Sequence, residues 1–306
     1  LPENPLTIAY IKESNIWVWT ADSGPNQITS GINVIDLRLS DDGSVIAYFN
    51  EAGDLQYELR AINSDGSNDR ILVSSAEFQA IVPDAASVAP NQFEWVPGTH
   101  QLAYNTRVIQ QAPGYIFNGD LTLVDADNLE KQVLFEKGSA GQFYFSPDAQ
   151  QIALVSPGSI SLANADGSNV REVLPFTVEG TGEDFAFYPV PKWSEDSSRL
   201  GVAIPASDPM ATARQEASLW LIPTDGSEAV KAGTIQTVFA PNWLYLSPDL
   251  EHVLYVLDSS EPGSNVRELH VARIDGTEDR VVKSQDYLMA YGWTSNETFL
   301  YSAGES

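Results

Sequence analysis

Residues 145–168 read FSPDAQQIALVSPGSISLANADGS, and this stretch decides the fold because its parts recur along the whole chain. It opens with an aromatic residue and a short acidic turn that contains proline, Phe145-Ser146-Pro147-Asp148. An alternating apolar strand follows, Gln151-Ile152-Ala153-Leu154, and the next strand ends in a second turn, Asn164-Ala165-Asp166-Gly167-Ser168. Alternation predicts a half-buried β-strand, and Asp-Gly suits a hairpin because glycine reaches positive φ without a Cβ clash.

The first turn occurs six times along the chain. Successive copies are separated by 56, 50, 48, 53 and 47 residues and begin at Leu39, Trp95, Phe145, Trp193, Leu246 and Trp293. The mean period of about 51 residues is the length of one four-stranded propeller blade with generous loops. No stretch shows a sustained helical period, so the sequence predicts an all-β chain. We expect the three tryptophans of this set to pack between neighbouring repeats.

The combined pattern, an aromatic-Ser-Pro-Asp turn followed by an alternating strand and an Asp-Gly-Ser turn, resembles the TolB-like repeat. That repeat also occurs in the propellers of prolyl-oligopeptidase relatives, and the resemblance covers essentially the whole chain. It implies one β-propeller domain over residues 1–306 that serves as an interaction platform outside the cytoplasm, in the cell envelope or extracellular space. We expect six four-stranded blades, with N- and C-terminal strands sharing one sheet so that no open edge remains. A seven-bladed ring with incomplete terminal blades is the alternative.

The expected blades follow from the positions of the turns. Five of them cover approximately 31–75, 91–136, 141–175, 189–232 and 242–284. The closing blade combines 287–304 with 5–30, where the N-terminal part supplies three strands and the C-terminal part supplies two.

The composition excludes several classes of partner. Sixteen basic residues stand against 42 acidic ones, so the net charge is −26, which opposes binding to nucleic acid or to anionic membrane surfaces. No apolar run approaches the roughly 20 residues of a membrane-spanning helix, so we expect no direct membrane insertion. The chain contains no cysteine, which removes disulfides and thiolate chemistry. We expect a monomer that binds a protein, peptide or glycan.

The lengths of the connections indicate where binding occurs. In a four-stranded blade the tight turns lie on one face, whereas the second-to-third loops and the crossings between blades lie on the other. Nearly all long connections fall in the second set, and irregular loops on a rigid scaffold commonly carry binding residues. These connections cover 76–92, 107–119, 175–190, 205–217, 232–242 and 258–267. The candidate ligand-binding residues on this long-loop face are Tyr115, Phe117, Glu183, Asp184, Phe187, Tyr188, Arg214 and Trp243.

The repeated aspartates of the second turn suggest calcium ligands, but the full calcium-loop spacing with its terminal glutamate is absent. Each aspartate occupies the position from which an Asx side chain bonds the backbone of its own turn. We therefore interpret these residues, and Asp148 and Asp249 of the first turn, as structural. The second-turn residues are Asp65, Asp127, Asp166, Asp225 and Asp275.

No motif of the chain predicts catalysis, a metal or a cofactor. The histidines are His100, His252 and His270; the first two adjoin tight turns and the third lies in a strand, so we do not expect them to converge on one metal. A G-x-S-x-G nucleophile motif is absent, and Gly180-Thr181-Gly182 lacks the lysine and flanking elements of a phosphate loop. The sequence therefore favours a binding protein. The alternative is a carbohydrate-active enzyme that uses Glu183 and Asp184 as acid and base.

Overall fold

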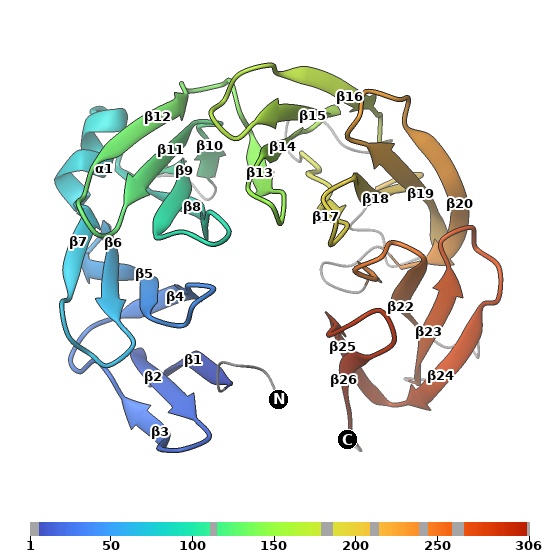
Figure 1. Cartoon of the computed structure of the whole chain (residues 1–306), viewed down its shortest axis with the longest axis horizontal. Helices are drawn as coiled ribbons and strands as arrows, with labels where there is room; N and C mark the ends of the chain where they lie inside the picture. Colours follow the sequence, from blue (N-terminus) through green and yellow to red (C-terminus); the bar gives the residue numbers. More distant parts are fainter. Residues whose placement is uncertain are drawn as a thin grey trace. The chain divides into compact units, whose positions relative to one another are not determined.

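The computed structural model describes residues 6–110, 115–178, 186–208, 214–238, 244–258 and 266–304. They belong to two compact units, Leu1–Phe145 and Ser146–Ser306, which we treat separately. The described part of the chain is nearly all-β, as the repeat predicts, and is built from antiparallel sheets with one short helix (Figure 1). No helix in these residues is long and apolar enough to span a membrane.

The first unit begins with a three-stranded sheet in the order β1-β2-β3 and continues with a four-stranded sheet in the order β4-β5-β6-β7. In its next sheet, β9 pairs with β8, β10 and β11, and β11 pairs with β12. The strands are β1 (Thr7–Lys12), β2 (Asn15–Thr20), β3 (Gly24–Gln27), β4 (Val34–Leu39), β5 (Val45–Gly53), β6 (Gln56–Asn63), β7 (Arg70–Val73), β8 (Ser87–Trp95), β9 (Gln101–Ile109), β10 (Tyr115–Phe117), β11 (Leu121–Asp125), β12 (Lys131–Phe135) and β13 (Gln142–Phe145).

The second unit contains sheets in the orders β17-β18-β19-β20 and β21-β22-β23-β24 and a two-stranded sheet, β25-β26. Its first strands follow the order β14-β15-β16. The strands are β14 (Gln151–Ser156), β15 (Ser159–Asn164), β16 (Arg171–Pro175), β17 (Lys192–Trp193), β18 (Arg199–Pro205), β19 (Gln215–Pro223), β20 (Val230–Thr237), β21 (Leu244–Leu246), β22 (His252–Asp258), β23 (Arg267–Arg273), β24 (Arg280–Gln285), β25 (Tyr287–Trp293) and β26 (Phe299–Gly304). The predicted strand plan is therefore confirmed within each unit, whereas closure of the sheets into a ring stays a prediction.

An irregularity recurs at one place in every four-strand repeat. The register between the third and fourth strands shifts by one residue in each repeat. The shift comes just before one equivalent residue of the third strand, the residue that pairs with the fourth residue of the second strand. An extra residue at such a point bends a strand and increases its twist. The shift precedes Arg60, Thr122, Ser161, Trp220 and His270. The repeats thus share backbone detail as well as strand order.

The core lies between neighbouring sheets. In the first unit one cluster includes Phe49, Phe93 and Trp95, and in the second unit another includes Tyr255 and Ile274. The Trp95 indole Nε1 donates to the Arg38 carbonyl at 2.9 Å, and Trp293 donates to the Tyr245 carbonyl at 3.0 Å. Each indole therefore bonds the backbone of the first strand in the preceding repeat. For Trp95 and Trp293 this is the inter-repeat packing that we expected of the tryptophans.

Several of the expected long connections contain regular structure; residues 232–242, for example, include 232–237 of β20 (Val230–Thr237). Residues 76–92 include the helix α1 (Ser75–Ile81) and the start of β8. The Ser74 side chain and Glu77 form a capping box, and the fully buried Phe78 anchors the helix. Residues 107–119 include β10, which pairs with the far end of β9. The expectation of irregular loops was wrong for these residues because a capping box and a strand pairing each satisfy backbone groups locally.

Four of the tight first turns share a clasp made by a buried serine. Each serine hydroxyl donates to the aspartate two residues later at 2.6–2.7 Å and accepts a backbone N–H from the start of the second strand at 2.9–3.1 Å. The serines are 0–4% exposed. The clasps join Ser40 to Asp42, Ser146 to Asp148, Ser194 to Asp196 and Ser247 to Asp249. The structural interpretation of Asp148 and Asp249 is therefore confirmed.

We predict that Ser146→Ala lowers the free energy of unfolding by about 1–3 kcal/mol, because it leaves the Gln151 N–H without its hydroxyl acceptor inside the protein. Ser168→Ala is the matched control: this hydroxyl also donates to an aspartate at 2.6 Å, but it is exposed and water replaces it. We expect a loss below about 0.5 kcal/mol for the control. Urea denaturation of both variants measures the difference, and equal losses would contradict the clasp.

Candidate functional site

The structure describes five of the eight candidate ligand-binding residues. Tyr115 and Phe117 lie on β10 in the first unit, where the Phe117 side chain is partly buried. Phe187 and Tyr188 of the second unit are also partly buried, and burial raises the pKa of the Tyr188 phenol. Arg214 is exposed and donates to the Asp258 carbonyl. The remaining three, Glu183, Asp184 and Trp243, lie outside the described residues.

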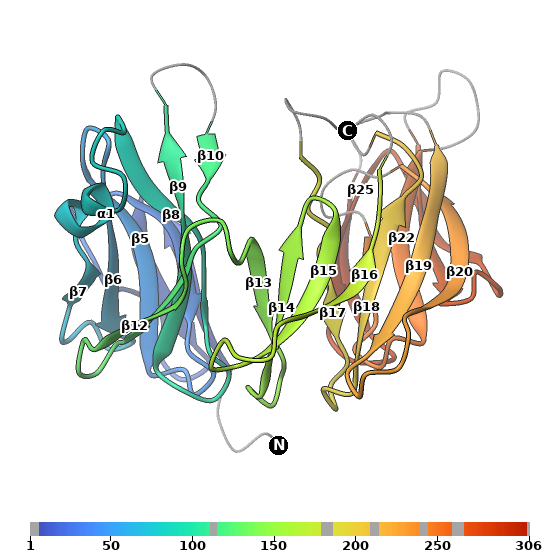
Figure 2. The same cartoon turned by 90° about the horizontal axis from the view of Figure 1, so that it is seen from above.

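The strand pair β9–β10 extends beyond the part of the sheet where β11 pairs. β11 is paired with β9 only over residues 101–104, whereas β10 pairs with residues 107–109 (Figure 2). β8 accompanies β9 over this whole length, since Ser87 pairs with Ile109. Ile116 of β10 is 52% exposed. This extension therefore presents an apolar side chain at the end of the sheet that is opposite to the tight turns.

A buried polar network supports the base of the extension. Asp120 accepts both the Thr106 N–H and the Thr106 hydroxyl at 2.8 Å, and Asn118 Nδ2 donates to the same hydroxyl oxygen at 2.7 Å. The three residues are no more than 7% exposed. Buried polar groups of this kind are costly to leave unpaired, so they fix the backbone that carries β10. The network therefore ties the residues that follow β10 to β9.

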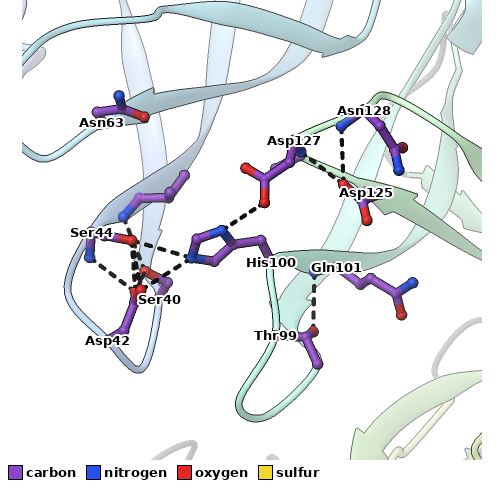
Figure 3. A network of polar contacts seen from close by, with 12 residues as sticks. Ser40, Asp42, Ser44, Asn63, Thr99, His100, Gln101, Asp125, Asp127 and Asn128 are labelled. Atoms are coloured by element: carbon purple, nitrogen blue, oxygen red, sulfur yellow. Dashed lines mark hydrogen bonds and ion pairs between the residues drawn. The ribbon is translucent and has the colours of Figure 1, made fainter.

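At the tight-turn end of the first unit, His100 joins turns from two other parts of the chain (Figure 3). Its Nε2 lies 3.3 Å from Asp42 Oδ2 and 3.2 Å from the Ser44 hydroxyl, and its Nδ1 lies 3.0 Å from Asp127 Oδ2. Arg70 approaches Asp127 at 3.8 Å. Partial burial lowers the pKa of His100, but the hydrogen bonds and charges of Asp127 and Asp42 outweigh this effect and raise the pKa above its ordinary 6.5.

Ser44, His100 and Asp127 have the distances of a Ser–His–Asp arrangement, but their protons are placed differently. The single proton of the Ser44 hydroxyl is donated to Asp42 at 2.8 Å, which leaves none for His100. Hydrogen bonds from Ser40 and Ser44 hold the pKa of Asp42 far below its usual range. An imidazole between two carboxylates is stabilised as the cation, which is a poor base. The geometry therefore describes an ionic clamp between turns.

Asp127 differs from its expected role in the turn. The backbone N–H groups of Asp127 and Asn128 donate to Asp125 Oδ1 at 2.8 and 3.1 Å, so Asp125 is the Asx residue of this turn. The expectation was wrong for Asp127. In this turn the aspartate that accepts the turn N–H groups stands two residues earlier, at Asp125, so the Asp127 carboxylate is left to contact His100. The other four second-turn aspartates each accept a backbone N–H two residues ahead, as expected.

His270 takes part in a network of the second unit that has a repeat-equivalent in the first. The Tyr255 hydroxyl donates to Asp279 at 2.9 Å, and His270 Nδ1 lies 3.0 Å from the same oxygen. In the first unit, the Tyr48 hydroxyl donates to Asp69 at 2.8 Å and Arg60 contacts both residues. These contacts tie the third strand to the turn before the fourth. Among the described residues, no three His, Asp or Glu side chains are arranged to hold a metal ion.

The sequence reasoning missed a polar row on the first strands of the first unit. Arg38 of β4 donates from Nε to Glu94 Oε1 of β8 at 2.9 Å and from Nη1 to Asp36 Oδ1 at 2.7 Å. Tyr144 of β13 donates to Gln142 at 3.0 Å. Arg38, Glu94 and Tyr144 each immediately precede the residue that starts a repeat. Comparing this one position across the repeats would have revealed the polar row from the sequence.

Comparison with solved structures identifies the architecture. An oligogalacturonate lyase in complex with manganese aligns with a TM-score of 0.59 at 16% identity, covering 89% of this chain and 71% of the lyase chain. A chain of a mitotic checkpoint complex aligns with a TM-score of 0.56 at 14% identity, covering 92% of this chain and 74% of the other. These likenesses show a propeller-type fold.

The propeller fold agrees with the expectation drawn from the repeat, and the likeness at this level of identity shows the fold alone. TolB from Acinetobacter baumannii aligns with a TM-score of 0.46 at 12% identity, covering 91% of this chain and 68% of that protein. This score is too low to place the chain in the TolB family. No protein-family model and no curated protein sequence matches the chain.

We predict that Asp127→Asn lowers the pKa of His100, since the ring loses the carboxylate that faces Nδ1. Asp125→Asn is the control, because an asparagine oxygen still accepts the turn N–H groups and Asp125 does not contact the ring. NMR titration of the His100 ring protons measures both. Because folding raises this pKa, the clamp stabilises the wild type fully below about pH 6.5 and loses this effect as the pH rises through the folded-state pKa. An unchanged pKa in Asp127→Asn would contradict the clamp.

Proposed function

We propose that the chain is a non-catalytic binding protein whose long-loop face recognises a protein, peptide or glycan. The observation that carries the proposal is the contrast between the two ends of the sheets in the first unit. At the tight-turn end, hydrogen bonds within and between the turns engage the polar side chains. At the opposite end, the β9–β10 extension presents the exposed Ile116 on a buried polar support.

Presentation of an apolar side chain on a hydrogen-bonded support is the property that favours binding. A preformed surface loses little conformational entropy when a partner binds. Aromatic residues such as Phe117 and Tyr188 add apolar area with directional polar contacts. One of the structurally similar chains belongs to a mitotic checkpoint complex, which is consistent with protein partners. A location outside the cytoplasm is also part of this proposal and rests on the resemblance of the repeat.

We predict that peptides selected from a random display library against the wild-type chain bind at least about tenfold more weakly to Ile116→Lys and to the double variant Phe187→Ala with Tyr188→Ala. Val133→Lys is the control, since Val133 of β12 is 56% exposed but lies on an outer strand. Its affinity should stay within about twofold of the wild type. Thermal midpoints should be unchanged; a stability loss of several kcal/mol would identify Phe187 and Tyr188 as packing residues instead.

We further propose that the chain forms a six-bladed ring, with strands from both termini completing one blade. Two observations support this proposal. The sheets β1-β2-β3 and β25-β26 have three and two strands, fewer than the sheets of the other repeats. Both carry exposed apolar side chains, including Ile8 at 44% and Leu300 at 58%. Unpaired edges and uncovered apolar faces are unfavourable in water, and pairing the termini removes both. Seven blades would leave the terminal sheets separate.

Closure predicts that Leu300→Glu destabilises the chain although Leu300 is 58% exposed in the structure. We expect a loss of about 1–3 kcal/mol, the usual cost of placing a charge in an apolar contact. Val230→Glu is the control, because Val230 is also 58% exposed but belongs to an outer strand; its loss should stay below about 0.5 kcal/mol. Urea denaturation compares the two, and equal effects would oppose closure.

A carbohydrate-active enzyme is the second candidate. The observation in its favour is the structural likeness to oligogalacturonate lyase, which was crystallised with manganese. The test is incubation of the wild-type chain with oligogalacturonate, with and without manganese, followed by chromatography of the products. Shortened, unsaturated products would replace the binding proposal with a lyase. An unchanged substrate under both conditions would exclude this activity.

A further inference from the structure

Asp120 is a buried carboxylate that has no basic partner among the described residues. It is 7% exposed and accepts two hydrogen bonds, from the N–H and the hydroxyl of Thr106, each at 2.8 Å. Every lysine, arginine and histidine of the chain lies within the described residues, yet Asp120 takes part in none of the ion pairs there. Buried charges are normally paired with an opposite charge or bound to a metal ion, because it is costly to remove a lone charge from water.

The equivalent residue of the other four-strand repeats is acidic only where a basic side chain faces it. This residue stands two positions before the one that follows the register shift of the third strand. Glu58 holds the position in one repeat and lies 3.0 Å from Arg60, and Glu268 holds it in another and lies 3.5 Å from His270. The two remaining repeats have a neutral residue at this position, Ser159 and Ser218.

The repeat that contains Asp120 departs from this pattern. The residue two positions later, where the other acidic repeats have Arg60 or His270, is the neutral Thr122. The surroundings are otherwise equivalent, since Tyr104 pairs with Thr122 as Tyr48 pairs with Arg60. The carboxylate has therefore been kept at this position without the basic side chain that accompanies it elsewhere, and a positive charge from outside the chain can take that place.

Asn118 supplies a second observation at the same point. Its Nδ2 donates at 2.7 Å to the Thr106 hydroxyl oxygen, and that hydroxyl donates to Asp120, so the amide and the carboxylate meet at one hydroxyl. Asn118 is 2% exposed, and its Oδ1 is buried without a hydrogen-bond donor among the described residues. Leaving a buried acceptor unpaired is unfavourable. A buried negative charge and a buried acceptor oxygen at one hydroxyl are the groups that a cation satisfies together.

We propose that the Asp120 carboxylate and Asn118 Oδ1 bind a monovalent metal cation, sodium. Carboxylate and carbonyl oxygens are the ligands that hard cations prefer. One carboxylate balances one positive charge, whereas a divalent ion would leave a net charge among buried groups. A site with a single carboxylate does not require the group of three acidic or histidine side chains that the described residues lack. The proposal is independent of whether the long-loop face binds a partner.

The test is the thermal midpoint of the full chain in sodium chloride and in choline chloride at equal ionic strength. An ion that binds only the folded chain stabilises it by mass action, so sodium should raise the wild-type midpoint by about 2–3 °C at about ten times the dissociation constant. Asp120→Asn should remove this difference. Glu130→Gln is the matched control, because Glu130 is exposed in the same unit and the net charge changes equally. It should keep the full sodium effect.

Thr122→Arg provides a second variant that retains the carboxylate. It supplies the guanidinium that Arg60 provides in the equivalent repeat, so the midpoint should be the same in both salts and no lower than that of the wild type in choline chloride. This variant decides the question if Asp120→Asn does not fold.

Three results would overturn the proposal. Equal wild-type midpoints in the two salts would mean that a water molecule or a proton satisfies these groups. A sodium effect that persists in Asp120→Asn or in Thr122→Arg would place the ion elsewhere. Stabilisation by calcium chloride but not by sodium chloride would exclude a monovalent ion.

Discussion

A buried serine hydroxyl at the start of four of the tight turns is the constraint on which those repeats depend. The serine donates to an aspartate and accepts a strand N–H inside the protein, because the buried hydroxyl does not meet water there. These two hydrogen bonds fix where the first strand ends and where the second begins. The second strand then has one register against the third, and the alternating apolar residues face the neighbouring sheets. The turn chemistry thereby sets the packing of the sheets.

The sequence predicted the strands well wherever a turn and an alternating run stood together, as in residues 145–168. The prediction failed for elements that are too short to show a periodic pattern of apolar residues. The helix α1 spans seven residues, too few to show helical periodicity, although Ser74 and Glu77 form a readable capping box. β10 spans three residues, and its pairing with β9 depends on a buried network of Thr106, Asn118 and Asp120 that no local pattern encodes.

The candidate sites were harder to predict than the fold, because they depend on residues far apart in the sequence. The interpretation of Asp127 as a turn residue was reasonable from its neighbours, yet the carboxylate faces His100, 27 residues away. The pairing of Arg38 with Glu94 joins residues 56 apart, which is one repeat. Such contacts can be found in a sequence by aligning successive repeats and looking for equivalent positions at which the residue type changes from one repeat to the next.

The sequence separations of the inter-sheet hydrogen bonds have a consequence for how the chain folds. Trp293 reaches Tyr245 across 48 residues, Arg171 reaches Thr224 across 53, and Arg70 reaches Ala126 across 56. Each of these bonds joins one repeat to the next and none skips a repeat. Linear repeat proteins with nearest-neighbour contacts can nucleate at any repeat and extend from it. A chain of this kind can begin to assemble on the ribosome as soon as two consecutive repeats have emerged, before its C-terminal strands exist.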